Sequence, residues 1–259
     1  MSPSPPLAGA TVVVTRPSES AGASVRMARR LGAGVVRLPG LGLRPIEDAA
    51  AARAGLARAA RADAWIFTSP AAVRHAFALV PALRPRRTTR VFAVGAGTAR
   101  ALLRHGIEAI HPPQGHDSNG LLALDALAEP RGWNIAVIDA PGGRDVIAPT
   151  LRARKATVER VHVYRRTAPR LDRRHFQALA DAPLPWISLV SSGEALDRLV
   201  AALPSALAAR WRGQAMVVSS RRLAARARAL GFSDVHVARS ALPADLFSSA
   251  ERVFARQRP

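Results

Sequence analysis

With 259 residues, of which 49% are apolar, the chain can bury the core of two ordinary domains or one large one, and it is not disordered as a whole. It has no cysteine, which excludes disulfides, thiolate metal sites and cysteine nucleophiles. Its formal net charge of +20 comes almost wholly from arginine, since Lys155 is the only lysine, and such a charge attracts polyanions.

The first half of the chain alternates strands and helices. Residues 1–9 are expected to form a loose tail, without the basic and apolar regions of a signal peptide. Apolar runs rich in β-branched residues then alternate with alanine- and arginine-rich segments of helical spacing. Strands are predicted at 11–15, 35–39, 64–69, 90–94 and 107–111, and helices at 20–31, 49–62, 70–79, 99–105 and from 118 onward.

The second half repeats this alternation and contains the only tyrosine, Tyr164. Strands are predicted at 134–138 and 158–164 and a helix at 146–154, and the stretch 161–169 is typical of a short strand ended by its proline. Three later segments match earlier ones in the same order, about 120–125 residues apart. The pairs are 64–69 with 185–192, 92–95 with 216–220, and the helix before 106 with the helix before 231.

The repeat predicts two α/β lobes with parallel sheets flanked by helices. Ligands of such sheets bind beyond the carboxyl ends of the strands, where this chain places small polar residues and arginines. Open backbone N–H groups there suit carboxylate or phosphate oxygens, although each such residue alone also fits an ordinary helix cap. The candidate binding residues are Thr15, Arg16, Thr68, Ser69, Gly95, Thr98, Gly142, Gly143, Arg144, Ser191, Ser192, Ser220 and Arg222.

Several common site motifs are missing from the sequence. It has no GxGxxG after a strand, no GxxxxGKS/T and no GxSxG, and its histidines lack a metal-binding spacing backed by carboxylates. Asp139, Asp145 and Asp234 have no obvious partner. We therefore expect a site of backbone donors, hydroxyls and arginines, without metal or cofactor. No apolar run approaches the roughly 20 residues that span a bilayer, so a soluble cytoplasmic protein is expected.

Short motifs along the chain combine into one resemblance. They are VTRP at 14–17, WIFTS at 65–69, AVGAGTA at 93–99 with Gly106, SNGLL at 118–122, GGR at 142–144, VYR at 163–165, SS at 191–192, VSSRRLA at 218–224 and GF at 231–232. In this order they resemble the uroporphyrinogen-III synthase family, from residue 12 to about residue 250. The chain departs from that family at 139–141, where many members have arginine and glycine, and at Pro70, where asparagine is common.

The resemblance implies two lobes joined by a two-stranded linker, with the active site in a cleft between them. Lobe 1 is expected at 1–37 and 168–259, lobe 2 at 47–160, and the linker strands at 38–46 and 161–167. The implied enzyme is a hydro-lyase that cyclises hydroxymethylbilane to uroporphyrinogen III, with inversion of the last pyrrole ring and no cofactor. Its substrate is a tetrapyrrole polycarboxylate, and a monomer in transient contact with the preceding pathway enzyme is expected.

Tyr164 is the candidate catalytic residue. The substrate hydroxyl must leave to form an electrophilic azafulvene, and its departure needs a proton. A phenol, with an ordinary pKa of about 10, keeps its proton at neutral pH and can supply it. The alternative role for Tyr164 is to position substrate only, since geometry supplies much of a cyclisation barrier.

Two other functions remain open at this stage. One is a two-lobed anion-binding or regulatory protein that kept the fold without catalysis. The other is nucleic-acid binding, but the arginines are spread along the chain and aromatic residues are too few for a stacking surface, so no nucleic-acid partner is expected.

Overall fold

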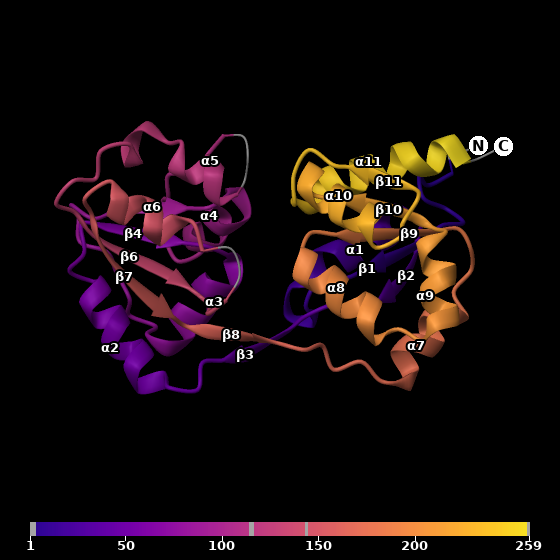
Figure 1. The fold of residues 1–259 in the computed structure, drawn as a ribbon, viewed down its shortest axis with the longest axis horizontal. Helices are drawn as coiled ribbons and strands as arrows, with labels where there is room; N and C mark the ends of the chain where they lie inside the picture. The colour runs from indigo at the N-terminus through magenta and orange to yellow at the C-terminus, as the bar shows by residue number, and fades with distance from the viewer. Residues whose placement is uncertain (1–3, 114–116, 143–144, 258–259) are drawn as a thin grey trace. The chain divides into compact units, whose positions relative to one another are not determined.

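The computed structural model describes residues 4–113, 117–142 and 145–257, and it divides into two compact units (Figure 1). Unit 1 consists of Met1–Gly42 and Thr167–Pro259, and unit 2 of Leu43–Arg166. No helix in these described ranges is long and apolar enough to cross a membrane.

Unit 2 is a parallel sheet with helices on both faces. Its elements are α2 (Ala49–Ala59), β4 (Ala64–Phe67), α3 (Pro70–Leu79), β5 (Arg90–Ala93), α4 (Ala96–Leu103), α5 (Ser118–Leu122), a 3-10 turn (Asp125–Leu127), β6 (Asn134–Asp139), α6 (Ile147–Ala153) and β7 (Thr157–His162). The strands pair in the order β5-β4-β6-β7. Since alternate residues face opposite sides of a strand, Trp65 and Phe67 share a core with α2, α3 and α4, and Ala64 and Ile66 share one with α5 and α6.

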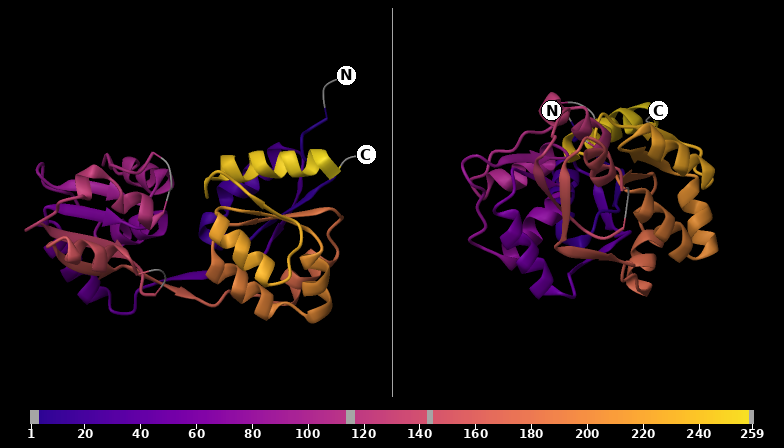
Figure 2. Two further views of the ribbon diagram at one scale, coloured as in Figure 1. Left: turned by 45° about the horizontal axis from the view of Figure 1, so that its top comes forward. Right: turned by 60° about the vertical axis from the view of Figure 1, so that its left-hand side comes forward.

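Unit 1 is built in the same way. Its elements are β1 (Thr11–Val14), a 3-10 turn (Ser18–Ser20), α1 (Gly22–Arg30), β2 (Gly34–Arg37), α7 (Arg173–Ala180), β9 (Trp186–Val190), α8 (Gly193–Ala202), α9 (Ser205–Arg212), β10 (Ala215–Val218), α10 (Arg221–Ala229), β11 (Val235–Val237) and α11 (Pro243–Gln257). The strands form one parallel sheet in the order β11-β10-β9-β1-β2. Val13 shares a core with α7 to α10, whereas Val12 and Val14 share one with α1 and α11, which covers the other face (Figure 2).

The two units have the same strand order if the two segments of unit 1 are read in the order 167–259 and then 1–42. In that order β10-β9-β1-β2 corresponds to β5-β4-β6-β7. Corresponding backbone bonds repeat as well: Val94 donates to the Phe67 carbonyl at 3.1 Å, and Ser219 to the Val190 carbonyl at 3.2 Å. Each sheet therefore has a point where the strand order reverses, between β4 and β6 in unit 2 and between β9 and β1 in unit 1.

Two further strands, β3 (Gly42–Pro45) and β8 (Tyr164–Thr167), pair with each other in a separate two-stranded sheet. The predicted strand 158–164 is therefore divided between two strands, because the chain pairs first with β6 and then with β3. β7 ends at His162 beside β6, Val163 still donates to Asp139, and Tyr164 begins the pairing with β3.

Other elements differ from the prediction in detail. The expected strand 107–111 is reduced to a single bridge between Ile110 and Phe92. Helix α4 begins three residues earlier than predicted, because Gly95 is extended and the helix starts directly after it. Helices α7, α8, α9 and α11 have no counterpart among the predicted elements; α7 and α9 carry few buried residues, so their apolar pattern is short.

Candidate active site

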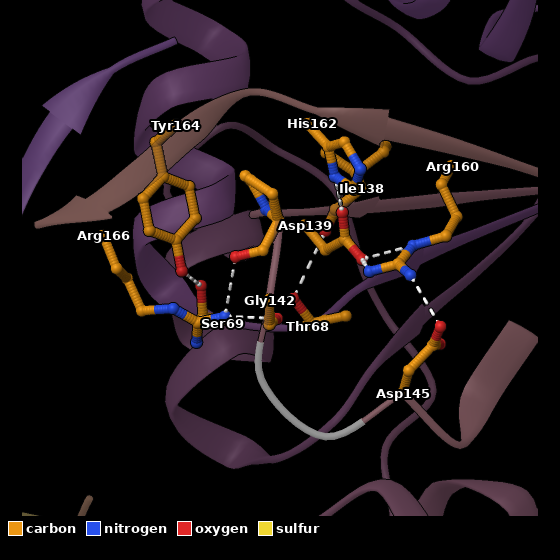
Figure 3. A network of polar contacts seen from close by, with 11 residues as sticks. Thr68, Ser69, Ile138, Asp139, Gly142, Asp145, Arg160, His162, Tyr164 and Arg166 are labelled. Atoms are coloured by element: carbon orange, nitrogen blue, oxygen red, sulfur yellow. Dashed lines mark hydrogen bonds and ion pairs between the residues drawn. The ribbon is translucent and has the colours of Figure 1, made fainter. Parts of the chain in front are cut away.

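A cavity of about 190 Å³ lies at the carboxyl ends of β4 and β6, where the strand order of the unit 2 sheet reverses. The loops after two such strands run to opposite faces of the sheet and leave a crevice between them. Residues that end or follow β4 and β6, together with residues on β7 and β8, supply most of its polar lining (Figure 3). The lining residues are Thr68, Ser69, Ser118, Val137, Asp139, Ala140, Gly142, Asp145, Ile147, Ala148, Arg160, Tyr164 and Arg166.

Tyr164 begins β8 and is buried, with 5% of its surface exposed. Its hydroxyl lies 3.2 Å from Ser69 Oγ, and either oxygen can donate the hydrogen bond. Its ring stacks on the imidazole of His75, with 5.2 Å between the ring centres and 14° between the planes. The phenol is thus held at both its ring and its hydroxyl by residues of the α3 segment.

Ser69 joins β4 to α3 and is the N-cap of that helix. Its backbone is extended, and its Oγ accepts a hydrogen bond from the Ala72 N–H at 3.0 Å. Pro70 occupies the first helical position, where the missing N–H has no partner within a helix in any case. The neighbouring Thr68 directs its hydroxyl to the Ile138 carbonyl of β6 at 3.5 Å. The sequence motif after β4 thus places two alcohols on the cavity wall.

Asp139 ends β6 and is buried, and its two carboxylate oxygens have different partners on β7. Oδ2 accepts from Arg160 Nε at 3.0 Å and from Nη2 at 2.7 Å, and Oδ1 lies 2.5 Å from His162 Nδ1. Arg160 also donates through Nη1 to Asp145 Oδ2 at 2.9 Å. Residues 160 and 162 reach the same carboxylate because they are two positions apart on one strand.

Burial raises the pKa of the Asp139 carboxyl above its usual range, although Arg160 and His162 both act to lower it. Loss of water around the carboxylate is the larger effect. The cavity lining contains a phenol, three alcohols, two carboxyl groups, of which that of Asp139 is buried, and two guanidinium groups. Such a set can move protons and bind carboxylates.

Arg166 holds the loop that follows β6. Its Nη2 donates to the Gly142 carbonyl at 2.5 Å and to the Pro141 carbonyl at 3.2 Å. Gly142 has φ +74°, a conformation that residues with a side chain rarely adopt. Of the predicted binding residues in this loop, Gly142 lines the cavity, and Gly143 and Arg144 lie outside the described residues.

The other two candidates of unit 2 do not line this cavity. Gly95 is the N-cap of α4 and is buried, and Thr98 is buried in the first turn of that helix. Both follow β5, which lies one strand away from the reversal point.

The remaining predicted residues belong to unit 1 and follow the carboxyl ends of its strands. Thr15, after β1, is buried and donates to the Leu189 carbonyl of β9 at 2.7 Å, so its hydroxyl proton already has an acceptor. Arg16 donates to the Ala241 carbonyl, and burial lowers the pKa of its guanidinium.

Four more candidates of unit 1 lie at the starts of two helices. Ser191 follows β9, and Ser192 caps α8 through a bond from the Ala195 N–H at 3.2 Å. Ser220 caps α10 in the same way, at 3.3 Å, and Arg222 is exposed on that helix. Ser192 and Ser220 thus act as caps, which was the simpler interpretation of these positions.

The expectation that three aspartates lack a partner is wrong. Asp139 and Asp145 share Arg160, and Asp234 pairs with His236 at 2.6 Å. The register of β6 against β7 brings the first pair together, and no single strand reveals it. A usable signal was present, since Arg160 and His162 alternate on the strand that follows the one ending in Asp139. In the described part of the chain, no group of three or more His, Asp or Glu side chains could hold a metal ion.

Sequence comparisons agree with one another. The family model described as "Uroporphyrinogen-III synthase HemD" matches residues 23–248. The uroporphyrinogen-III synthase of Escherichia coli K12 is 30% identical over 236 residues, which cover 89% of this chain and 96% of the relative. The enzyme of the same name from Salmonella typhimurium LT2 is 34% identical over 161 residues, or 59% of this chain and 63% of the relative.

Solved structures share the fold at low identity. A mutant uroporphyrinogen III synthase from the thermophilic bacterium Thermus thermophilus matches with a TM-score of 0.63 and 18% identity, over 95% of this chain and 99% of that one. The uroporphyrinogen-III synthetase of Helicobacter pylori 26695 matches with a TM-score of 0.59 and 12% identity, over 94% and 99% of the two chains. The predicted α/β fold with parallel sheets flanked by helices is thereby confirmed.

Proposed function

The chain belongs to the uroporphyrinogen-III synthase family, and from that premise we propose that it cyclises hydroxymethylbilane to uroporphyrinogen III with loss of water and inversion of the last pyrrole ring. The match over nearly the whole length of the Escherichia coli relative carries this proposal. The cavity of unit 2 supports it, because the reaction needs a proton donor and many groups that bind the carboxylates of the substrate. The residues that line this cavity include groups suited to both needs.

Tyr164 is the proposed acid. Its phenol lines the cavity and touches Ser69, and a phenol can protonate the departing hydroxyl so that it leaves as water. The azafulvene that remains is attacked by the last pyrrole ring, and the ring closes through a spiro intermediate. Restoration of aromaticity at the end releases one proton, which returns the phenolate to the phenol. The chemistry therefore needs no net proton and no redox partner.

We propose that cationic and N–H groups of the protein bind the carboxylates of the substrate. Arg160 and Arg166 line the same cavity, and guanidinium groups bind carboxylates well. Arg160 already donates through all three of its nitrogens to Asp139 and Asp145, so of the two we propose Arg166 as the ligand. The net charge of +20 favours an eight-carboxylate substrate over neutral compounds. We keep the candidate residues of unit 1 as further ligands on the same chemical grounds, and we propose a cytoplasmic monomer.

The test is a product analysis. Enzymatically made hydroxymethylbilane is incubated with the protein, and the type I and type III isomers of uroporphyrinogen are separated. We expect type III from the wild type. If only the type I isomer is found, which forms spontaneously, the chain is not this enzyme and the alternative function, a non-catalytic anion-binding protein, is supported.

A variant tests the role of Tyr164. Tyr164→Phe keeps the ring on His75 and removes the only phenolic proton, so we expect the rate of type III formation to fall about 10²–10⁴-fold. Thermal unfolding checks that the fold is retained. An unchanged rate in a folded variant leaves Tyr164 only a positioning role.

A further inference from the structure

We propose that Ser69 is a positioning residue for Tyr164: the serine hydroxyl donates to the phenolic oxygen, which turns the phenol proton toward the cavity and stabilises the phenolate left after proton transfer. The inference deepens the proposed function, from which it takes the role of Tyr164 as a proton donor. Its own observations are the two bonds at Ser69 Oγ and the helix that this serine caps.

The hydrogen-bond inventory of Ser69 limits the possibilities. A serine hydroxyl has one proton and two lone pairs. One lone pair accepts the Ala72 N–H at 3.0 Å, because Ser69 is the N-cap of α3. The contact of 3.2 Å to Tyr164 then uses either the serine proton or the second lone pair.

Two features favour the serine as donor. A hydroxyl that already accepts a hydrogen bond is polarised and donates more strongly. The N-terminus of α3, a ten-residue helix, carries partial positive charge, which favours negative charge on the nearby phenolic oxygen. Once the phenol has lost its proton, donation from the serine is the one orientation that remains, so the protein need not rearrange as the charge develops.

Stacking on His75 supports the same arrangement. The imidazole and the phenol lie 5.2 Å apart with nearly parallel planes, and His75 belongs to the helix that Ser69 caps. One helix therefore sets both the ring plane and the hydrogen bond of the phenolic oxygen. With the ring and the oxygen held in place, only the direction of the phenol O–H bond can still vary. Because the serine donates to the phenolic oxygen, this O–H bond points away from α3.

Charged and titratable groups on the elements around the phenol must also be kept constant in a test. They are His75 on α3, Arg44 on β3, Asp139 on β6, Asp145 after it, Arg160 and His162 on β7, and Arg165 and Arg166 on β8. A change at Ser69 alone leaves all of them in place. The difference between variants then isolates the serine hydroxyl.

The experiment uses the fact that Tyr164 is the only tyrosine in the chain. The near-ultraviolet absorbance of phenolate, followed against pH while the circular dichroism stays constant, reports this one residue. We expect Ser69→Ala to move the midpoint to higher pH by about one unit, because the phenolate loses a donor. Ser69→Thr, which keeps the hydroxyl, should restore the wild-type midpoint.

Controls separate the hydroxyl from the helix cap. Ser192→Ala removes the matching cap of α8 in unit 1, where no tyrosine is present, so we expect no change in the midpoint. If Ser69→Ala does not fold, Ser69→Gly is used, because glycine costs an N-cap only a few tenths of a kcal/mol. An unchanged or lowered midpoint in the folded variant, or a Thr variant that behaves like Ala, overturns the proposal.

Activity gives an independent second readout. With hydroxymethylbilane, we expect Ser69→Ala to lower kcat for type III formation about 10-fold or more, with a smaller change in KM, and Ser69→Thr to recover most of it. The titration needs no substrate. A wild type that makes no uroporphyrinogen III therefore refutes the proposed function and leaves the serine–tyrosine inference to be judged by its own measurement.

Discussion

At the scale of single residues, Asp139 shows how a charge that looks unfavourable in the sequence is accommodated. A lone carboxylate would repel a polycarboxylate, but here its oxygens are occupied by Arg160 and His162. Arg160 also pairs with Asp145, so the Asp139 carboxylate is part of an ion-pair network.

The raised pKa of Asp139 predicts a pH dependence of stability. A carboxyl whose folded pKa lies above its unfolded value near 3.8 binds more protons in the folded state. The free energy of unfolding therefore falls as the pH rises from about 4 through the folded pKa. Asp139→Asn should remove this component and give a flatter profile in chemical denaturation as the pH rises above about 4.

A matched variant controls that measurement. Asp181→Asn changes an exposed carboxylate after α7 and should keep the wild-type profile. If Asp139→Asn and the wild type lose stability in parallel over this pH range, burial of Asp139 is not the cause.

At the scale of elements, close approach of backbone segments decides which positions tolerate a side chain. Gly40, between β2 and β3, packs against the first turn of α8. A Cβ built on it would lie 2.5 Å from the Ala195 carbonyl oxygen and 2.6 Å from the Ala195 Cβ. The obstacle is largely helix backbone, which cannot swing aside as a flexible side chain does.

Gly40→Ala should therefore destabilise the protein by about 2–3 kcal/mol, as expected for a forced overlap in a packed region. Gly213→Ala is the control, because a Cβ there would lie 3.7 Å from the Arg210 carbonyl and φ is −79°. We expect that change to be neutral or slightly stabilising. Equal unfolding free energies of the two variants in denaturant titrations would contradict this account.

At the scale of the whole molecule, the two units differ in how the chain builds them. Unit 2 is one continuous segment, 43–166, with cores on both faces of its sheet. Unit 1 takes β1 and β2 from residues before 43 and the rest from residues after 166. In its sheet β1 lies between β9 and β2, so the late segment alone keeps only β11-β10-β9 and leaves β9 without a neighbour on one side.

Fragments should behave accordingly. The segment 43–166 should fold by itself with a cooperative thermal transition, whereas 167–259 should remain largely unfolded until 1–42 is added. Far-ultraviolet circular dichroism and the dispersion of amide proton signals report both states. Cooperative unfolding of 167–259 in isolation would show that β1 is not needed.

Some elements and site residues can be predicted from local sequence, whereas others depend on contacts between distant parts of the chain. Buried parallel strands are apolar runs bounded by glycine and small polar residues, so β1, β4, β6, β9 and β10 are recognisable from local sequence, as is α3, whose bounds agree with the prediction. The predicted polar residues after β4 and Gly142 in the loop after β6 do line one cavity.

The network around Asp139 was missed because it depends on strand register. Arg160 and His162 are 21 and 23 residues from Asp139 along the chain and meet it only when β7 pairs with β6. The stacking of His75 on Tyr164 depends in the same way on where α3 packs. Contacts of this type are set by tertiary structure: the alternation of Arg160 and His162 shows that both side chains share one face of a strand, but not which residue they meet.

The shared strand order of the units has a consequence for circular permutation of the chain. Near the start of the chain a Cβ on Gly9 would touch the Phe254 ring of α11 at 4.0 Å, so the two terminal segments of unit 1 come together. A circular permutant that opens at Leu43, runs to the present C-terminus and continues through a short linker into the present N-terminus would encode two contiguous half-proteins in tandem. In such a permutant each half would carry its own complete parallel sheet, with β4 to β7 in the first half and β9 to β11, β1 and β2 in the second.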